Sequence, residues 1–296
     1  MDRAIHITFL TPYVSSLTRD QDYLHVPLPL DGALAHAAYW RALVAGDISW
    51  SATGNQADPA IMDAYVRPEL DAVLDSVSLG DRDLLNDSSL TEQVYRISSG
   101  FPVHRGQLYL KYGARWIQLD TGLNFIPELE RQPIRKRVDR HRLNYLDLGL
   151  VTERGRPEAK VEWGKGAVKP IDNRMTTWRV YHYVWLAQVR DESRLRQLLE
   201  VLKFQGMGKK RTAGFGKIHT YEIQPLPPGI TIEQKLFLKR QDELVLLRPL
   251  PYDAIMSASR RIVMTNLVVE SGCGYQPPYW NKRRVVVREG TLFKFA

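Results

Sequence analysis

The chain has 296 residues, of which 44% are hydrophobic and 25% are charged, and its formal net charge is +8 at pH 7. The length suits one large domain or two medium ones, and the composition is close to that of an average globular protein. These values exclude a wholly disordered chain, a collagen-like repeat and a coiled-coil rod.

The N-terminal part of the sequence predicts a strand followed by a helix. Alternating apolar residues predict the strand over 5–10. A stretch rich in Leu and Ala predicts the helix over 30–44, with Asp31 as its N-cap and Gly46 as its stop signal.

The next part predicts a second helical segment and three strands. The helical segment covers 58–75 and is expected to break at Pro68. Short runs of apolar and β-branched residues predict the strands, and Gly113-Ala114 fits a tight turn between the last two. The predicted strands cover 94–97, 107–112 and 115–119.

The segment from about 125 to 178 is irregular, basic and rich in proline, which indicates a hairpin or a flap. A strand is predicted over 179–189 and a helix over 192–204. The apolar face of that helix is predicted to consist of Leu195, Leu198, Leu199 and Leu202.

A glycine-rich loop follows this helix over 206–214 and leads into a strand predicted over 215–223. Strand–helix–strand therefore occurs twice, which favours an α+β, ferredoxin-like core with helices on one face of an antiparallel sheet. We expect residues 1–224 to form this core with the basic insertion, and residues 225–296 to form a β-rich extension packed on it.

Charge is distributed unevenly along the chain. Residues 1–100 contain 6 Arg, no Lys and 14 acidic residues, whereas the rest contains 35 basic and 19 acidic residues. The basic residues cluster at 131–142, 203–217 and 282–288, beside Gly, Pro or aromatic residues. This pattern favours a polyanion as partner, with an acidic protein partner or a solvated surface as the alternatives.

The loop GMGKKRTAGFG at 206–216 is the motif most suggestive of a ligand. It does not match the Walker A or Rossmann patterns, which precede a helix, whereas this loop precedes a strand. Its glycines allow positive φ and close approach of the main chain to a ligand, and consecutive amides can bind an anion. Lys209, Lys210 and Arg211 add three cations at the same place.

A helix followed by G-x-G-K-x-R-[ST]-x-G-[FY]-G and a strand resembles the glycine-rich loop of the RAMP superfamily, the RNA-binding subunits of CRISPR systems. Residues 27–37 (PLPLDGALAHA) resemble the start of the first helix in a particular member. That member is the type IV effector subunit of the CRISPR-associated five group, and 164–170 (GKGAVKP) and 274–280 (GYQPPYW) also resemble it. Residues 47–142 carry no such match.

The resemblance implies a non-catalytic, cytoplasmic subunit that binds the 5′ handle of CRISPR RNA. As partners it implies backbone subunits resembling the CRISPR-associated seven group, a large subunit, and target DNA near the handle. It implies no association with a membrane and no cofactor or metal. A thumb-like hairpin would insert beside the handle. RNA-facing residues carried over from the family are Gly206, Gly208, Lys209, Lys210, Arg211, Thr212 and Gly214, together with Lys165 and Lys169.

Charge alone adds Arg135, Lys136, Arg137 and Arg140, and also Arg142, as candidates for nucleic-acid contact. The aromatic residues Tyr181, Tyr183 and Trp185 alternate on one face of a predicted strand. Two interpretations are open for them, stacking of RNA bases and packing beneath a helix, and we favour packing.

Two other functions remain open. One is the equivalent subunit of a type III effector complex. The other is a metal-independent endoribonuclease of the same superfamily that processes repeat RNA, for which His25 and His36 are the candidate general bases. We expect His36 to pack within its helix, because its neighbours are small and apolar. The single cysteine, Cys273, excludes an internal disulfide, and the start of the chain does not resemble a signal peptide.

Overall fold

The computed structural model describes only part of the chain. The described residues are 1–11, 13, 29–48, 59–78, 93–104, 107–112, 115–120, 130–138, 171–179, 181–208, 211, 214–226, 232–233, 237–240, 243–257, 262–264, 269–274, 283–289 and 291–295. The chain divides into two compact units. The first contains Met1–Leu129 and Arg179–Ala296, and the second contains Glu130–Trp178.

The first unit is built on a six-stranded sheet with the order β10-β1-β9-β4-β5-β6. Each strand in this order pairs antiparallel with its neighbours. The strands are β1 (Asp2–Phe9), β4 (Phe101–His104), β5 (Gln107–Tyr112), β6 (Arg115–Asp120), β9 (His182–Gln188) and β10 (Ile218–Pro225).

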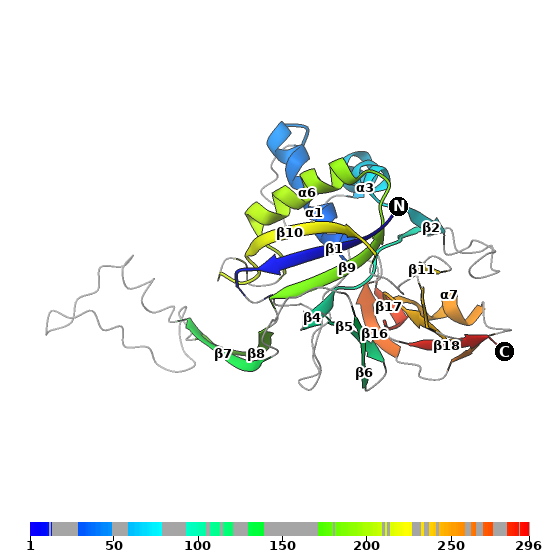
Figure 1. The fold of residues 1–296 in the computed structure, drawn as a ribbon. Helices are drawn as coiled ribbons and strands as arrows, with labels where there is room; N and C mark the ends of the chain where they lie inside the picture. The colour runs from blue at the N-terminus through cyan, green and yellow to red at the C-terminus, as the bar shows by residue number, and fades with distance from the viewer. Residues whose placement is uncertain are drawn as a thin grey trace, which may run out of the picture. The chain divides into compact units, whose positions relative to one another are not determined.

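Helices α1 (Asp31–Ala45) and α6 (Glu192–Gln205) complete the core. The path β1-α1-β4-β9-α6-β10, with β1 and β9 central and β10 and β4 flanking them, is the ferredoxin-like arrangement. The predicted α+β, ferredoxin-like fold is therefore confirmed. Figure 1 shows α1 and α6 together on one face of β1, β9 and β10.

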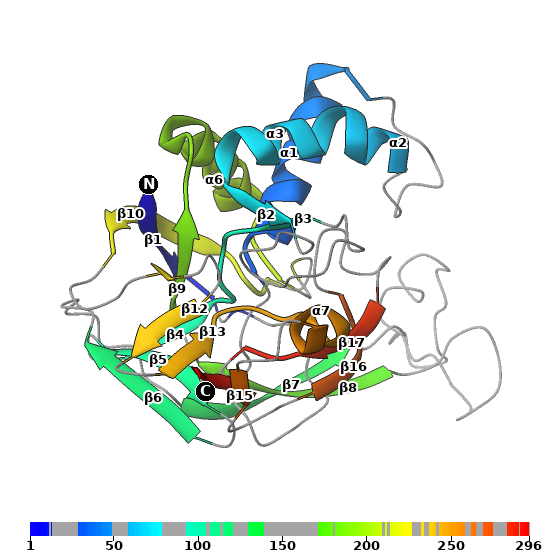
Figure 2. The same cartoon turned by 90° about the vertical axis from the view of Figure 1, so that its right-hand side faces the viewer.

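Helix α6 forms as its sequence predicts. Its N-cap is Asp191, whose side chain accepts a hydrogen bond from the Arg194 N–H at 3.0 Å. The buried residues of the helix are Leu195, Leu198, Leu199 and Leu202, as predicted. Helices α1, α3 (Arg67–Val73) and α6 gather into one layer, which Figure 2 shows from the side.

Helix α1 has nearly its predicted extent, but the predicted N-cap is wrong. The N-cap is Leu30, which makes no side-chain capping bond, and Asp31 is the first helical residue. The Asp31 carboxylate accepts from the Gly32 N–H at 2.9 Å and from Arg248 Nη1 at 3.1 Å. Gly46 ends the helix with φ 85°, as expected of a left-handed C-cap.

The segment predicted as helical over 58–75 is continuous but irregular. It contains α2 (Pro59–Ile61), a π-helical turn η1 (Met62–Val66) and α3 (Arg67–Val73). Pro68 lies in the first turn of α3, directly after the π-helical turn. The predicted break at Pro68 is therefore wrong, and the segment instead changes from π to α geometry beside it.

The predicted strands that follow are present. β2 (Ser76–Ser78) pairs with β3 (Gln93–Tyr95), which begins one residue before the strand predicted over 94–97. β5 and β6 pair from Gln107↔Asp120 to Tyr112↔Arg115, which leaves two residues between them. Those two, the predicted turn at Gly113-Ala114, lie outside the described residues.

The aromatic residues of β9 lie on the helix-covered face of the sheet. Tyr183 pairs with Ile7, which on its other side pairs with Tyr221, and the Tyr221 hydroxyl hydrogen-bonds Glu200 of α6 at 2.8 Å. Tyr183 and Trp185 are buried, with ring centroids 6.0 Å apart. The packing interpretation is confirmed for these two residues, and base stacking on them is excluded.

The part of the chain after residue 231 consists mainly of strands. It forms a five-stranded sheet β11-β12-β13-β18-β15 and a three-stranded sheet β14-β17-β16. The elements are β11 (Ile232–Glu233), β12 (Phe237–Arg240), β13 (Glu243–Leu246), β14 (Leu250–Pro251), α7 (Tyr252–Ser257), β15 (Ile262–Met264), β16 (Val269–Gly274), β17 (Arg283–Val287) and β18 (Leu292–Phe295).

Main-chain and side-chain contacts join these strands to the core. The Ser99 N–H donates to the Leu247 carbonyl at 2.8 Å. Arg248 follows directly and reaches Asp31 at the start of α1 and the Tyr95 carbonyl, to which its Nη1 donates at 2.6 Å. The extension is thus attached through a buried ion pair.

The second unit contains a two-stranded sheet of β7 (Glu130–Val138) and β8 (Ile171–Arg179). Arg135, Lys136 and Arg137 belong to β7. Residues 139–170 lie outside the described residues, so a thumb-like hairpin in this region stays a prediction.

Candidate nucleic-acid interface

The glycine-rich loop begins where α6 ends. The Gly206 N–H donates to the Leu202 carbonyl at 2.7 Å and closes the helix. Met207, near the start of the loop, then meets Gly216 at its end, because the Met207 N–H donates to the Gly216 carbonyl at 2.8 Å. Met207 and Gly216 therefore form a narrow neck at which the two ends of the loop meet.

All four glycines of this loop have positive φ, as predicted: 75° at Gly206, 85° at Gly208, 87° at Gly214 and 67° at Gly216. Two of them also permit close approach of the chain to itself. A Cβ on Gly216 would lie 1.8 Å from the Met207 carbonyl oxygen, and one on Gly206 would lie 2.9 Å from the Gly216 oxygen.

These glycines have two different roles. Gly206 and Gly216 are buried and allow the neck to close. Gly208 and Gly214 are exposed, and a Cβ on Gly214 would meet no atom within 4 Å. The main chain at Gly208 and Gly214 is therefore open to a ligand. At the neck, the main chain of Gly206 and Met207 instead contacts that of Gly216.

The neck is attached to the end of strand β1. The Leu10 N–H donates to the Lys217 carbonyl at 2.7 Å, and the Lys217 N–H donates to Thr11 Oγ1 at 2.9 Å. Since β1 is a central strand of the sheet, the loop is anchored on the rigid core.

Arg211 lies at the tip of the loop and meets helix α1. Its Nη1 lies 3.2 Å from Nε2 of His36, and the Gly214 N–H donates to its carbonyl at 2.8 Å. The Arg211 side chain is exposed. The structure thus brings together the glycine-rich loop and the first helix, two segments that are separated by 175 residues in the sequence.

His36 is uncharged in this arrangement. Burial and then the adjacent Arg211 guanidinium lower its pKa to about 4. Because a guanidinium only donates, Nε2 of His36 must accept, so its proton is on Nδ1. The ring also meets Trp40 edge-to-face, with centroids 6.4 Å apart. The prediction that His36 packs within its helix is correct in part, since the residue is half-buried but reaches the loop.

The structure does not place the other predicted contact residues relative to this site. Lys209, Lys210, Thr212, Lys165, Lys169 and Arg140 lie outside the described residues. Arg135, Lys136 and Arg137 belong to the second unit. His25 and Arg142 also lie outside the described residues.

Phe204 is a feature that the sequence analysis did not single out. It lies in the last turn of α6, directly before the loop, and 94% of its surface is exposed. Lys203 beside it is also exposed. The helical period could have identified Phe204, because it does not fall on the stripe that ends at Leu202. An exposed ring beside a cation is a combination typical of single-stranded nucleic-acid sites.

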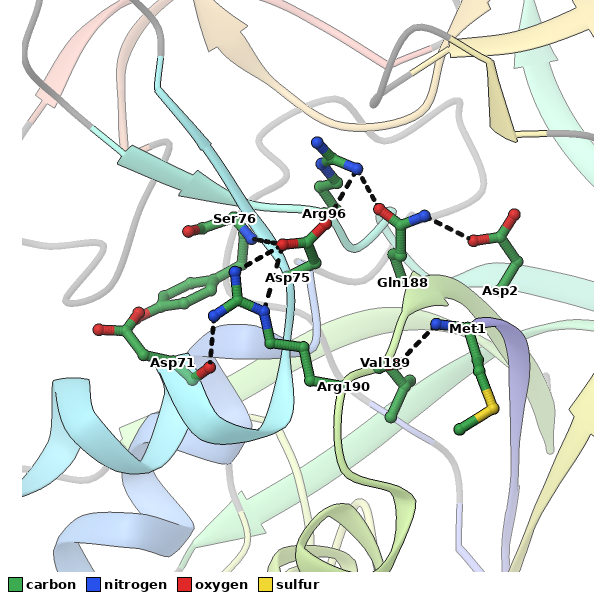
Figure 3. Close-up of polar contacts among 10 residues, drawn as sticks. Met1, Asp2, Asp71, Asp75, Ser76, Arg96, Gln188, Val189 and Arg190 are labelled. Carbon is green, nitrogen blue, oxygen red and sulfur yellow. Dashed lines mark hydrogen bonds and ion pairs between the residues drawn. The ribbon is translucent and has the colours of Figure 1, made fainter.

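A second polar cluster lies where β9 ends (Figure 3). Asp75 receives two hydrogen bonds from Arg190, the shorter at 2.7 Å, and an ion pair from Arg96 at 2.9 Å. Arg96 also hydrogen-bonds Gln188, which donates to Asp2 at 3.0 Å. The carboxylates and guanidinium groups here are turned toward one another, so we interpret the cluster as structural.

This cluster predicts a pH dependence of stability. Burial raises the pKa of Asp75, but the Arg190 hydrogen bond and the charges of Arg96 and Arg190 outweigh it, and the net pKa is lowered. A lowered folded-state pKa stabilises the fold above the unfolded-state pKa, and the effect is lost as pH falls through the folded-state value. Asp75→Asn should therefore have a smaller free energy of unfolding than the wild type at pH 7. The difference between the two, measured by unfolding in urea, should narrow below about pH 4.

Asp63→Asn is the matched control, because Asp63 forms an exposed i,i+4 pair with Arg67 at 3.0 Å. Such pairs contribute at most about 1 kcal/mol. A gap between Asp75→Asn and the wild type that does not change with pH would contradict the prediction.

Within the described ranges, His, Cys, Asp and Glu side chains form no group of three or more that could hold a metal ion. None of the helices that the structure describes is both long and apolar enough to cross a membrane.

Neither the protein-family models nor the curated proteins include a match. Among solved structures, the chain is similar to a chain of the crystal structure of a Csm3–Csm4 subcomplex in the type III-A CRISPR-Cas interference complex. The TM-score is 0.41 and the sequence identity 11%, over 100% of this chain and 93% of that chain.

Proposed function

We propose that this chain is a non-catalytic RNA-binding subunit of a CRISPR effector complex and holds the 5′ handle of CRISPR RNA in the loop at 206–216. The observation that carries the proposal is the geometry of that loop. Its neck is closed by Met207 and Gly216, it is anchored on β1, and its tip presents exposed glycines and an exposed Arg211.

The chemistry of the loop suits an RNA phosphate chain. Gly208 and Gly214 are exposed and have positive φ, so a ligand can approach the main chain there, and main-chain amides together with cations bind phosphate oxygens. Lys209 and Lys210 add charge in the same segment of sequence. Phe204, at the end of α6, offers a ring on which one unpaired base can stack.

The resemblance of residues 27–37, 164–170 and 274–280 assigns the subunit to a type IV complex. Its partners there are backbone subunits resembling the CRISPR-associated seven group, a large subunit and target DNA beside the handle. A type III complex is the alternative. The genes that neighbour the gene of this protein would distinguish a type IV from a type III system.

Loss of the three loop cations is expected to weaken binding of repeat-derived RNA and to flatten its salt dependence. Each phosphate contact to a single strand contributes about −0.7 to the slope of log K against log salt. The triple variant Lys209→Ala, Lys210→Ala and Arg211→Ala should therefore lower the magnitude of the slope by about 2 in a filter-binding titration.

The control is a second triple variant that removes the same charge elsewhere: Arg67→Ala, Arg194→Ala and Arg196→Ala. These arginines are exposed on α3 and in the first half of α6. Binding that does not depend on the 5′ handle, or that is unchanged in the loop variant, would exclude the proposal. Purified protein free of nucleic acid, together with capture of an acidic protein, would favour a scaffold instead.

One observation favours a second function, a metal-independent endoribonuclease. His36 is uncharged and lies beside a cation of the loop, and its Nε2 can accept the proton of a 2′-hydroxyl only after Arg211 moves away from it. Incubation with unprocessed repeat RNA in the presence of a chelator distinguishes the two functions. Cleavage that is lost in His36→Ala, or in His25→Ala, would establish the nuclease.

A further inference from the structure

We propose that His36 is a positioning residue for the RNA-binding loop: its imidazole holds the Arg211 guanidinium in place, so that the remaining N–H groups face a phosphate. This inference rests on the proposed function. It assigns to the first helix a part in RNA binding that does not depend on cleavage.

The contact leaves most of the guanidinium available. Arginine has five N–H groups, and one nitrogen, Nη1, is directed at Nε2 of His36. The other groups form the planar fork that binds two oxygens of a phosphate. Arg211 is exposed, so a phosphate can reach them without displacing His36.

The chemistry of His36 is suited to this role. An uncharged imidazole accepts from the guanidinium, and unlike a carboxylate it does not neutralise the charge that the phosphate needs. The half-buried ring is supported by Trp40 on the same helix, with an interplanar angle of 78°. The ring is therefore held by the core while its Nε2 is directed at the loop.

The benefit is a lower entropy cost of binding. A free arginine side chain must be immobilised when it binds, whereas one that is already held loses less freedom. Fixing one such side chain in advance corresponds to about a threefold to tenfold gain in affinity.

The test is a double-mutant cycle in the full chain, with repeat-derived RNA as the probe. His36→Leu should weaken binding about threefold to tenfold. His36→Gln, whose amide oxygen can accept from Arg211, should stay within about twofold of the wild type. In the Arg211→Ala background, His36→Leu should have no further effect.

Val44→Ala is the control for a general effect on the helix, since Val44 is an exposed residue of α1. A second measurement does not require a His36 variant to fold. In NMR titration, Arg211→Ala should raise the pKa of His36, because the Arg211 charge contributes to lowering it.

Several outcomes would overturn the inference. One is a His36→Leu loss that persists in the Arg211→Ala background, and others are no loss at all or a His36 pKa that does not move. If the loop cations matter but His36 does not, the inference fails and the proposed function stands. If the wild type does not bind handle RNA, the proposed function fails with it.

Discussion

Replacing Arg248 by methionine is expected to destabilise the folded chain by about 3–5 kcal/mol. The side chains of Arg248 and Asp31 are fully buried and form an ion pair at 3.1 Å. Arg248 also donates to the Tyr95 carbonyl at 2.6 Å. Removing the guanidinium leaves a buried carboxylate and a buried carbonyl without that partner, and the cost of such groups exceeds the net worth of the pair.

The measurement is the free energy of unfolding in urea. The matched control is Arg196→Met, because Arg196 pairs with Glu192 on an exposed face of α6 at 2.7 Å and should cost less than about 1 kcal/mol. The double variant Arg248→Met with Asp31→Leu should recover part of the loss, since it leaves no unpaired charge. Equal losses for Arg248→Met and Arg196→Met would contradict this account of the extension's attachment.

Gly216→Ala is expected to open the neck of the glycine-rich loop, whereas Gly214→Ala is expected to leave it closed. Both residues have positive φ, so alanine at either position costs about 1–2 kcal/mol in backbone strain. Only at Gly216 would the new Cβ also meet a main-chain atom, the Met207 oxygen at 1.8 Å. Relieving that clash costs about 1–3 kcal/mol more and removes the Met207–Gly216 hydrogen bond.

The comparison of these two variants separates backbone strain from close packing. Unfolding in urea measures the difference in stability, and filter binding with repeat-derived RNA measures the effect on the loop. We expect Gly216→Ala to lose most of the RNA affinity and Gly214→Ala to keep more of it. Two variants of equal stability and affinity would show that the neck is not the feature that shapes the loop.

Much of the fold can be predicted from short-range patterns. The four leucines of α6 repeat at helical spacing and are buried as expected. The strands at 107–112 and 115–120 alternate and are two residues apart, which is sufficient to predict their pairing. The positive φ values of the loop glycines also follow from residue type alone.

The predictions that were wrong or incomplete depend on distant partners. Asp31 has the residue type and position of an N-cap, but its carboxylate is used by Arg248, 217 residues later. His36 has the apolar neighbours of a packed residue, but Arg211 meets it from 175 residues later. For Trp185 the sequence favours packing but leaves base stacking open, and its burial in the core decides between them.

By itself, the sequence therefore determined α1, α6, several strands of the core and the loop as the candidate for phosphate binding, because each depends on residues a few positions apart. The order of these elements along the chain indicated the ferredoxin-like class. Only the tertiary structure decided that Asp31 joins the extension to the core and that the first helix supports the loop. Those contacts join residues that are far apart in the sequence and come together only when the chain folds. A periodic pattern within a short segment therefore cannot predict them.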